Sequence, residues 1–170
     1  MGSGDMGLGA QSGSSSSDLA IQRMRAEQVV KAAAGWFVWI AGLSMVNSVL
    51  SISGAGLRFI FGLGIAQVVD GIAHSAENSG AVLDLIINGF VAGIFVVFWN
   101  FARKGEKWAF IVGMLLYLLD GLLLLMFKDI LGIAFHAYAL FRIYGGLKAL
   151  PLLEQLQLAT APAGAPINPK

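Results

Sequence analysis

The chain has 170 residues, of which 57% are hydrophobic and 12% are charged, and its formal net charge is +1. A soluble domain carries about 25% charged residues because its surface must meet water, so this composition excludes an ordinary soluble fold. The small net charge argues against a large nucleic-acid-binding surface. The absence of cysteine excludes disulfides, thiolate nucleophiles and cysteine-ligated metals.

The two ends of the chain are more polar than its middle. Residues 1–17 are rich in Gly and Ser and are predicted to be disordered. Residues 18–31 are predicted to form a short surface helix with Asp18 as its N-cap. Residues 151–170 are rich in Pro and Ala toward the end and are predicted to be mostly disordered.

Residues 32–150 form the predicted transmembrane domain. They contain five apolar segments, each close to the roughly 20 residues that a helix needs to cross the hydrocarbon. The segments are 32–52, 57–76, 80–102, 108–127 and 130–147. They lack the period-two alternation of barrel strands, so we expect an all-α integral membrane bundle of about five transmembrane helices. The second segment is the weakest, because it contains Arg58, Gln67 and Asp70.

A weak internal repeat relates the first four segments. The pairs Asp70-Gly71 and Asp120-Gly121 recur at nearly the same spacing as Ala41-Gly42 and Ala92-Gly93. Two tandem helical hairpins followed by a fifth helix would produce this pattern. Chance similarity between apolar segments is the alternative explanation.

The basic residues leave the orientation open. If all five segments cross, one side holds Arg23, Arg25, Lys31 and Lys128, and the other holds Arg58, Arg103, Lys104, Lys107 and Lys148. The positive-inside rule cannot choose between such similar sets. If the second segment instead enters and returns, only Arg58 and Lys128 lie opposite all the others. The repeat favours full crossing, and the charges favour the re-entrant scheme.

Three stretches carry a resemblance to a known group of proteins. They are FGLGIAQVVDGIA, FARKGEKWAFIVGMLLYLLDGLLLL and IAFHAYALFRIYGGLKAL. Together they resemble a group of small bacterial multi-spanning membrane proteins, over roughly residues 34–150. The resemblance implies a bacterial cytoplasmic (inner) membrane location. It implies no activity and no functional residues.

Five polar residues inside the apolar segments are the candidate site. With five alternating crossings and a rise of about 1.5 Å per residue, Asp70, Asn88, Asp120 and His136 fall in one layer nearer to the N-terminal side. Arg142 lies deeper, within reach of that layer. An ionised group in hydrocarbon costs roughly 2.5–3.5 kcal/mol, so we expect these side chains to face the interior and pair. We predict a structural network with Arg142 bound to Asp70 or Asp120; a proton, cation or ligand site is the alternative.

The sequence favours a non-enzymatic membrane protein, either a transporter of protons, cations or small molecules or a structural membrane subunit. The alternative is a membrane enzyme acting on a lipid or quinone, with Asp70, Asp120 and His136 as acid and base groups. Asp70 and His74 have a spacing that can hold a metal, but two ligands do not make a site. We expect no metal and no cofactor. The expected partners are the lipid bilayer and either further copies of the chain or a larger membrane complex, without nucleic acid.

Overall fold

The computed structural model describes residues 8–52 and 80–161, and this part of the chain is helical throughout apart from short turns. Its helices are α1 (Leu8–Ile52), α3 (Gly80–Ala102), α4 (Lys107–Met126) and α5 (Ile130–Ala159). All four are long and apolar enough to cross a membrane, which indicates a multi-pass membrane protein. The predicted segment 57–76, with Asp70 and His74, lies outside the described residues.

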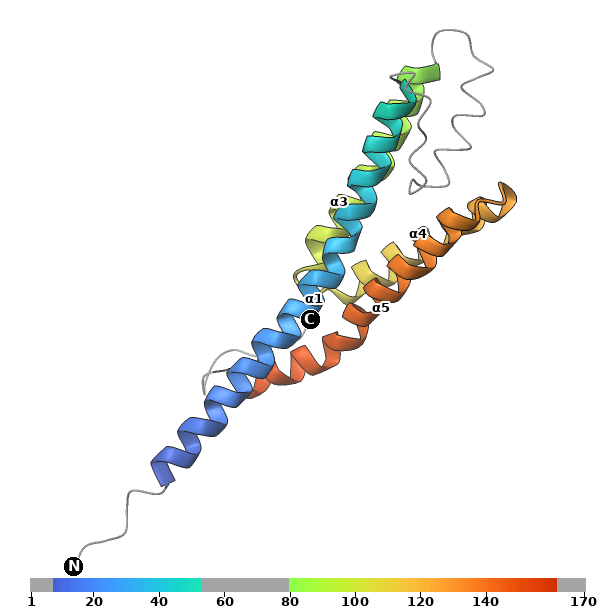
Figure 1. Cartoon of the computed structure of the whole chain (residues 1–170). Helices are drawn as coiled ribbons and strands as arrows, with labels where there is room; N and C mark the ends of the chain where they lie inside the picture. The colour runs from blue at the N-terminus through green and yellow to red at the C-terminus, as the bar shows by residue number, and fades with distance from the viewer. Residues whose placement is uncertain (1–7, 53–79, 162–170) are drawn as a thin grey trace, which may run out of the picture.

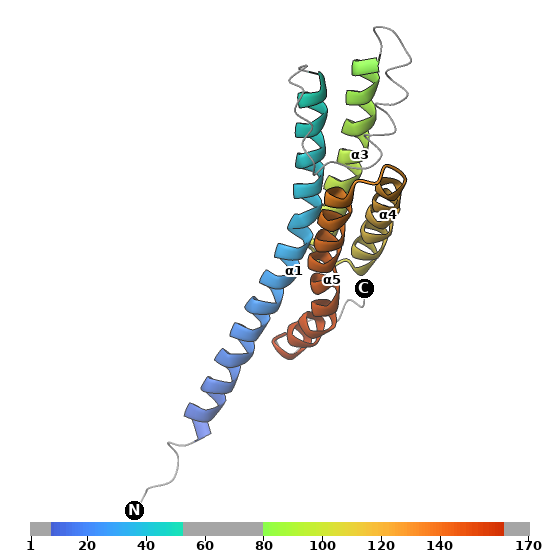
Figure 2. The same cartoon turned by 45° about the vertical axis from the view of Figure 1, so that its right-hand side comes forward.

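Helix α1 is the axis on which the other helices assemble. Helices α3 and α5 both pack against α1, and α4 packs against α5 and, less extensively, α3. Figures 1 and 2 show that α3 and α5 run antiparallel to α1, and that α4 and α5 form an antiparallel hairpin. In Figure 1 this hairpin diverges from α1 and α3 at the end that carries the α4–α5 turn.

Each helix buries one stripe of residues spaced alternately three and four apart. On α4 the stripe contains Phe110, Gly113, Tyr117, Asp120 and Leu124. On α5 it contains Gly132, His136, Ala139, Ile143, Gly146 and Leu150. This spacing keeps one face of a helix against a neighbour that crosses it at a shallow angle, as in most membrane bundles. The opposite faces of both helices expose large apolar side chains such as Leu115 and Phe141.

Glycines let α1 approach its neighbours closely. A Cβ atom added to Gly146 of α5 would overlap the Cβ of Ala33. A Cβ added to Gly113 of α4 would lie 2.7 Å from the ring of Phe37. Phe37 is fully buried and also contacts Phe95 of α3, with 6.2 Å between the ring centroids. Small residues at these crossings therefore let α3 and α4 pack around Phe37, and let α5 pack closely against α1 at Ala33.

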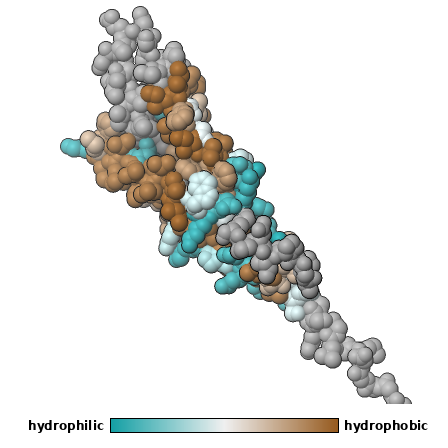
Figure 3. Space-filling model, turned by 180° about the vertical axis from the view of Figure 1, so that it is seen from behind, coloured by the Kyte–Doolittle hydropathy of each residue, from teal (hydrophilic) through white to brown (hydrophobic). Residues whose placement is uncertain are grey.

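The polar side chains gather toward one end of the molecule. Figure 3 shows hydrophobic residues over much of the surface and a hydrophilic band toward the end where α1 begins. The α3–α4 turn lies at this end, because Gly105, with a φ of +86°, lies next to Leu150 in the last third of α5. At the same end Arg23 of α1 donates to Thr160 Oγ1, at 3.0 Å, beyond the end of α5.

Two predicted boundaries differ from the structure. The predicted surface helix 18–31 is not separate: α1 begins at Leu8, inside the Gly/Ser-rich stretch predicted to be disordered, and continues into the membrane segment. At the other end α5 continues through Pro151 to Ala159, although disorder was predicted from residue 151. Leu153 and Leu156 are buried in the cluster that contains Ala26 and Val30 of α1, and this burial stabilises the extension. Figure 2 shows the final part of α5 bent from its earlier axis, as a proline inside a helix causes.

The directions of the helices also bear on the number of crossings. Five alternating crossings would place 80–102 parallel to 32–52, whereas α3 runs antiparallel to α1. Among the described residues, the polar end therefore holds Arg23, Arg25, Lys31, Arg103, Lys104, Lys107 and Lys148. Lys128 lies at the opposite end, in the α4–α5 turn. Of the basic residues named here, all within the described part of the chain, Lys128 alone is thus separated from the others.

Candidate functional site

The structure brings Asp120 and His136 together inside the α4–α5 hairpin. Nε2 of His136 lies 2.8 Å from Oδ2 of Asp120, and Nδ1 lies 2.9 Å from the carbonyl oxygen of Gly132. His136 is 3% exposed and Asp120 is 8% exposed. Both residues belong to the buried stripes of their helices, so the antiparallel packing of α4 on α5 aligns them.

The hydrogen bonds define how many protons the pair holds. The carbonyl oxygen of Gly132 can only accept, so Nδ1 of His136 carries a hydrogen and donates it. The short contact between Nε2 and Oδ2 then requires one further proton between these two atoms. The pair is either an imidazolium with a carboxylate or a neutral imidazole with a carboxylic acid, and its net charge is zero in both forms. A neutral pair is the form that an apolar environment tolerates best.

The α4–α5 turn sets the position of the imidazole. Lys128 adopts a positive φ of 56°, and the side chain of Asp129 caps α5 by accepting a hydrogen bond from the backbone nitrogen of Gly132, at 2.9 Å. The carbonyl of this same Gly132 accepts from His136. A Cβ at Gly132 would lie 2.7 Å from Oδ2 of Asp129, so only glycine fits both the cap and the contact with α4.

Two neighbours of His136 were not identified from the sequence as site residues. The ring of Tyr117 stacks on the imidazole, with 4.1 Å between centroids and 15° between planes. Gly121 lies so close that an added Cβ would be 3.2 Å from Cδ2 of His136. Tyr117 precedes Asp120 by three residues and Gly121 follows it, so one face of α4 surrounds the imidazole.

Asn88 lies apart from this pair, in the interface between α1 and α3. It is buried in the same stripe of α3 as Phe95, whose ring contacts Phe37 of α1. Because the two helices are antiparallel, Asn88 and Ser44, each about two turns from that aromatic contact, fall at the same level of the interface. Ser44 and Ser48 are also buried there. Asn88 thus belongs to a different pair of packed helices from Asp120 and His136.

The predicted pairing of Arg142 with Asp120 is wrong. Arg142 is exposed, and its guanidinium carbon lies 6.0 Å from the centroid of the Trp36 ring. The position of Arg142 is off the buried stripe of α5, which continues from Ala139 to Ile143. The side chain can therefore extend toward the polar end of the molecule, where its charged group stays hydrated. Whether Asp70 joins any of these residues lies outside the described part of the chain.

The predicted depth of the pair also needs correction. Asp120 and His136 lie near the α4–α5 turn, which is remote from the polar end where α1 begins. The prediction placed them nearer to the N-terminal side, because it assumed five alternating crossings. Both residues lie at the predicted distance along their helices from the α4–α5 turn. This turn, however, is at the opposite end of the molecule from the predicted one.

Comparison with known proteins provides no second line of evidence. No protein family, curated protein or solved structure matches this chain. Within residues 8–52 and 80–161, no three His, Cys, Asp or Glu side chains come close enough to hold a metal ion. The geometry of the Asp120–His136 pair therefore carries the functional argument.

Proposed function

We propose that this chain is a non-enzymatic multi-pass membrane protein that acts as a structural membrane subunit. In this proposal the neutral Asp120–His136 pair fixes the register of the α4–α5 hairpin. The observation that carries the proposal is the hydrogen bonding of His136, whose two ring nitrogens are both satisfied within the hairpin. A polar pair that is fully satisfied and buried specifies one packing arrangement, because any slip between the helices leaves polar groups unpaired.

The closed environment of the pair supports a structural role over an enzymatic one. A general base must come within about 3 Å of the proton that it removes from a substrate. Nε2 of His136 is occupied by Asp120, and the imidazole lies between Tyr117 and the backbone at Gly121. A lipid or quinone would have to displace these contacts before reaching either group.

Proton transport is the second candidate, and one observation favours it. Nε2 of His136 and Oδ2 of Asp120 are 2.8 Å apart, close enough to share one proton, in a hairpin that diverges from α1 and α3 at that end. A transporter would need to give this proton access to each side of the membrane in turn. In a static subunit the proton stays in place.

Proton flux into proteoliposomes tests the two candidates. Asp120→Asn is the informative variant, because its amide can donate to Nε2 of His136 but cannot exchange a proton with it. A structural subunit predicts no flux from the wild type above empty liposomes and near-normal thermal stability of Asp120→Asn. Flux in the wild type that disappears in Asp120→Asn would contradict the structural proposal and support transport. Tyr117→Phe serves as the matched control, since it keeps the pair.

The proposed location is the bacterial cytoplasmic membrane, with the start of α1 and the end of α5 on the cytoplasmic side. The resemblance seen in the sequence supports the membrane. The basic residues at the polar end support the orientation, because cytoplasmic segments are enriched in Lys and Arg.

A structural role also implies assembly with further copies of this chain or with a larger membrane complex. The mass of the particle purified in mild detergent tests this assembly.

A further inference from the structure

An open groove lies between α1 and α5, close to the polar end of the molecule. It has a volume of about 460 Å³, and Val29, Ala32 and Phe141 are among its apolar lining residues. The lining includes Ala33 and Gly146, where the two helices come together. Gly145 opens the groove, because a Cβ at this position would meet nothing within 4 Å.

Two basic side chains line the same groove. Arg142 and Lys148 both lie on α5 and are exposed. They are about 9 Å apart along the helix axis, and both line the groove, so an anionic group inside it lies within reach of both long side chains. Each lies over an aromatic ring, Arg142 over Trp36 and Lys148 over Tyr144. Neither makes a salt bridge with an acidic side chain of the described residues.

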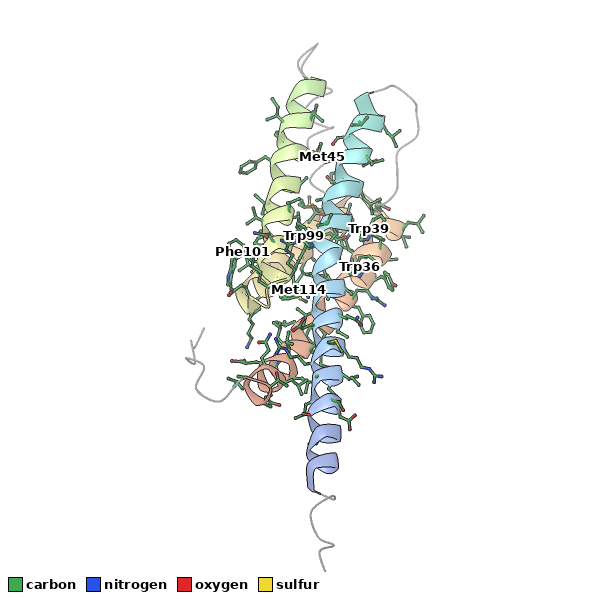
Figure 4. All side chains as sticks on the ribbon, turned by 90° about the vertical axis from the view of Figure 1, so that its left-hand side faces the viewer. Trp36, Trp39, Met45, Trp99, Phe101 and Met114 are labelled. Atoms are coloured by element: carbon green, nitrogen blue, oxygen red, sulfur yellow. The ribbon has the colours of Figure 1, made fainter. Side chains whose placement is uncertain are left out.

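The level of the groove is the boundary between the apolar and polar parts of the molecule. Figure 4 shows Trp36 and Trp39 of α1 at a similar height to Trp99 and Phe101 of α3. Arg103, the first residue of the α3–α4 turn, lies over the ring of Trp99, at 4.4 Å from its centroid. Aromatic and basic residues gather in this way where a membrane meets water. The groove therefore opens at the depth of the lipid headgroups.

We propose that this groove binds an anionic phospholipid. The headgroup phosphate lies between Arg142 and Lys148, and an acyl chain lies along the apolar wall that contains Val29 and Phe141. Basic pockets between transmembrane helices on the positively charged side bind such headgroups. The chemistry favours a lipid over free phosphate, because a hydrated anion gains nothing from the apolar wall.

Lipid retention measured by native mass spectrometry tests the proposal. The protein is reconstituted in nanodiscs of phosphatidylglycerol and phosphatidylcholine in equal parts and then released into detergent. We expect the wild type to retain phosphatidylglycerol selectively. Removing both charges in the Arg142→Gln/Lys148→Gln variant should lower the affinity about 25-fold, since each basic residue near an anionic surface contributes roughly a factor of five. Gly145→Leu keeps both charges but fills the groove, and it should also abolish retention.

Matched controls separate a built site from general electrostatic attraction. Arg103→Gln/Lys104→Gln removes two charges at the same end but outside the groove, and it should retain the lipid. Gly42→Leu adds the same side chain at an exposed position of α1 where a Cβ also meets nothing, and it should retain the lipid too. Equal retention of phosphatidylcholine would overturn the proposal. So would an equal loss in the Arg103/Lys104 control, or displacement of the lipid by millimolar inorganic phosphate.

Discussion

At the scale of the residue, a single hydrogen bond between Asp120 and His136 joins α4 to α5. An isolated carboxylate or imidazolium would be costly at this position, because little water reaches it. Sharing a proton removes the net charge while both hydrogen bonds of the imidazole are kept. The two residues should therefore behave as a unit whenever one of them is changed.

A double-mutant cycle measures this coupling. Asp120→Leu and His136→Leu should each lower the free energy of unfolding by about 1–3 kcal/mol, because each leaves a buried polar partner unsatisfied. The double variant should lose at least about 1 kcal/mol less than the two single losses combined, since neither of the two groups is then left facing a missing partner. Reversible unfolding in detergent micelles gives the values. Additive losses would mean that the two residues act independently.

The stacking of Tyr117 on His136 gives a second prediction at this scale. Tyr117→Leu should lower stability by roughly 1–2 kcal/mol, because it removes the stack on the imidazole and the contact with Phe95, whose ring lies edge-on at 5.9 Å. Tyr117→Phe keeps the ring and should change stability by less than about 0.5 kcal/mol. The same unfolding measurement applies. An equal loss in both variants would assign the effect to the hydroxyl group.

At the scale of the element, the buried stripes determine which polar residues meet. Depth along a helix, estimated from the rise per residue, correctly places Asp120 and His136 at a similar distance from the α4–α5 turn. Depth says nothing about which face a residue occupies, and the prediction for Arg142 failed for this reason. The three–four spacing of Phe110, Gly113, Tyr117, Asp120 and Leu124 was present in the sequence and would have identified the face of Asp120. The corresponding spacing on α5 includes His136 and excludes Arg142.

Adjacent glycines on α5 allow a matched test of helix packing. Gly146→Ala should lower stability by about 1–3 kcal/mol, because the new methyl group overlaps Ala33 and forces α1 and α5 apart. Gly145→Ala places its methyl group in open space and should be neutral or slightly stabilising, since alanine favours the helix. Thermal unfolding monitored by circular dichroism compares the two. Equal effects would mean that α1 and α5 do not meet at Gly146.

At the scale of the whole molecule, helix content follows from composition but topology does not. Long apolar segments without period-two alternation fix an all-helical structure, because backbone groups in lipid must be satisfied within the chain. The order of crossings depends on how every segment behaves, including the segment 57–76 outside the described residues. The internal repeat favoured one scheme and the basic residues favoured another. In the described helices, the basic residues were the better guide.

Cysteine labelling tests this topology directly, because the chain has no cysteine of its own. Single variants Gln22→Cys, Lys104→Cys and Lys128→Cys are all at exposed positions. In intact cells with an impermeant maleimide, Lys128→Cys should be labelled from outside. Gln22→Cys and Lys104→Cys should react only after the membrane is opened. Labelling of Gln22→Cys and Lys104→Cys from opposite sides would contradict the antiparallel arrangement of α1 and α3.

The continuity of α1 has a mechanical consequence. The helix contains 45 residues and is therefore about 67 Å long, roughly twice the thickness of the hydrocarbon layer. Its first residue lies about 50 Å from the centre of the apolar segment 32–52. With a lever arm of that length, a tilt of about 10° within the membrane moves the tip of the helix by about 9 Å. A spin label at Gln22, about 30 Å from the same centre, would move by about 5 Å for that tilt and would report small reorientations of the bundle before any contact within the membrane had broken.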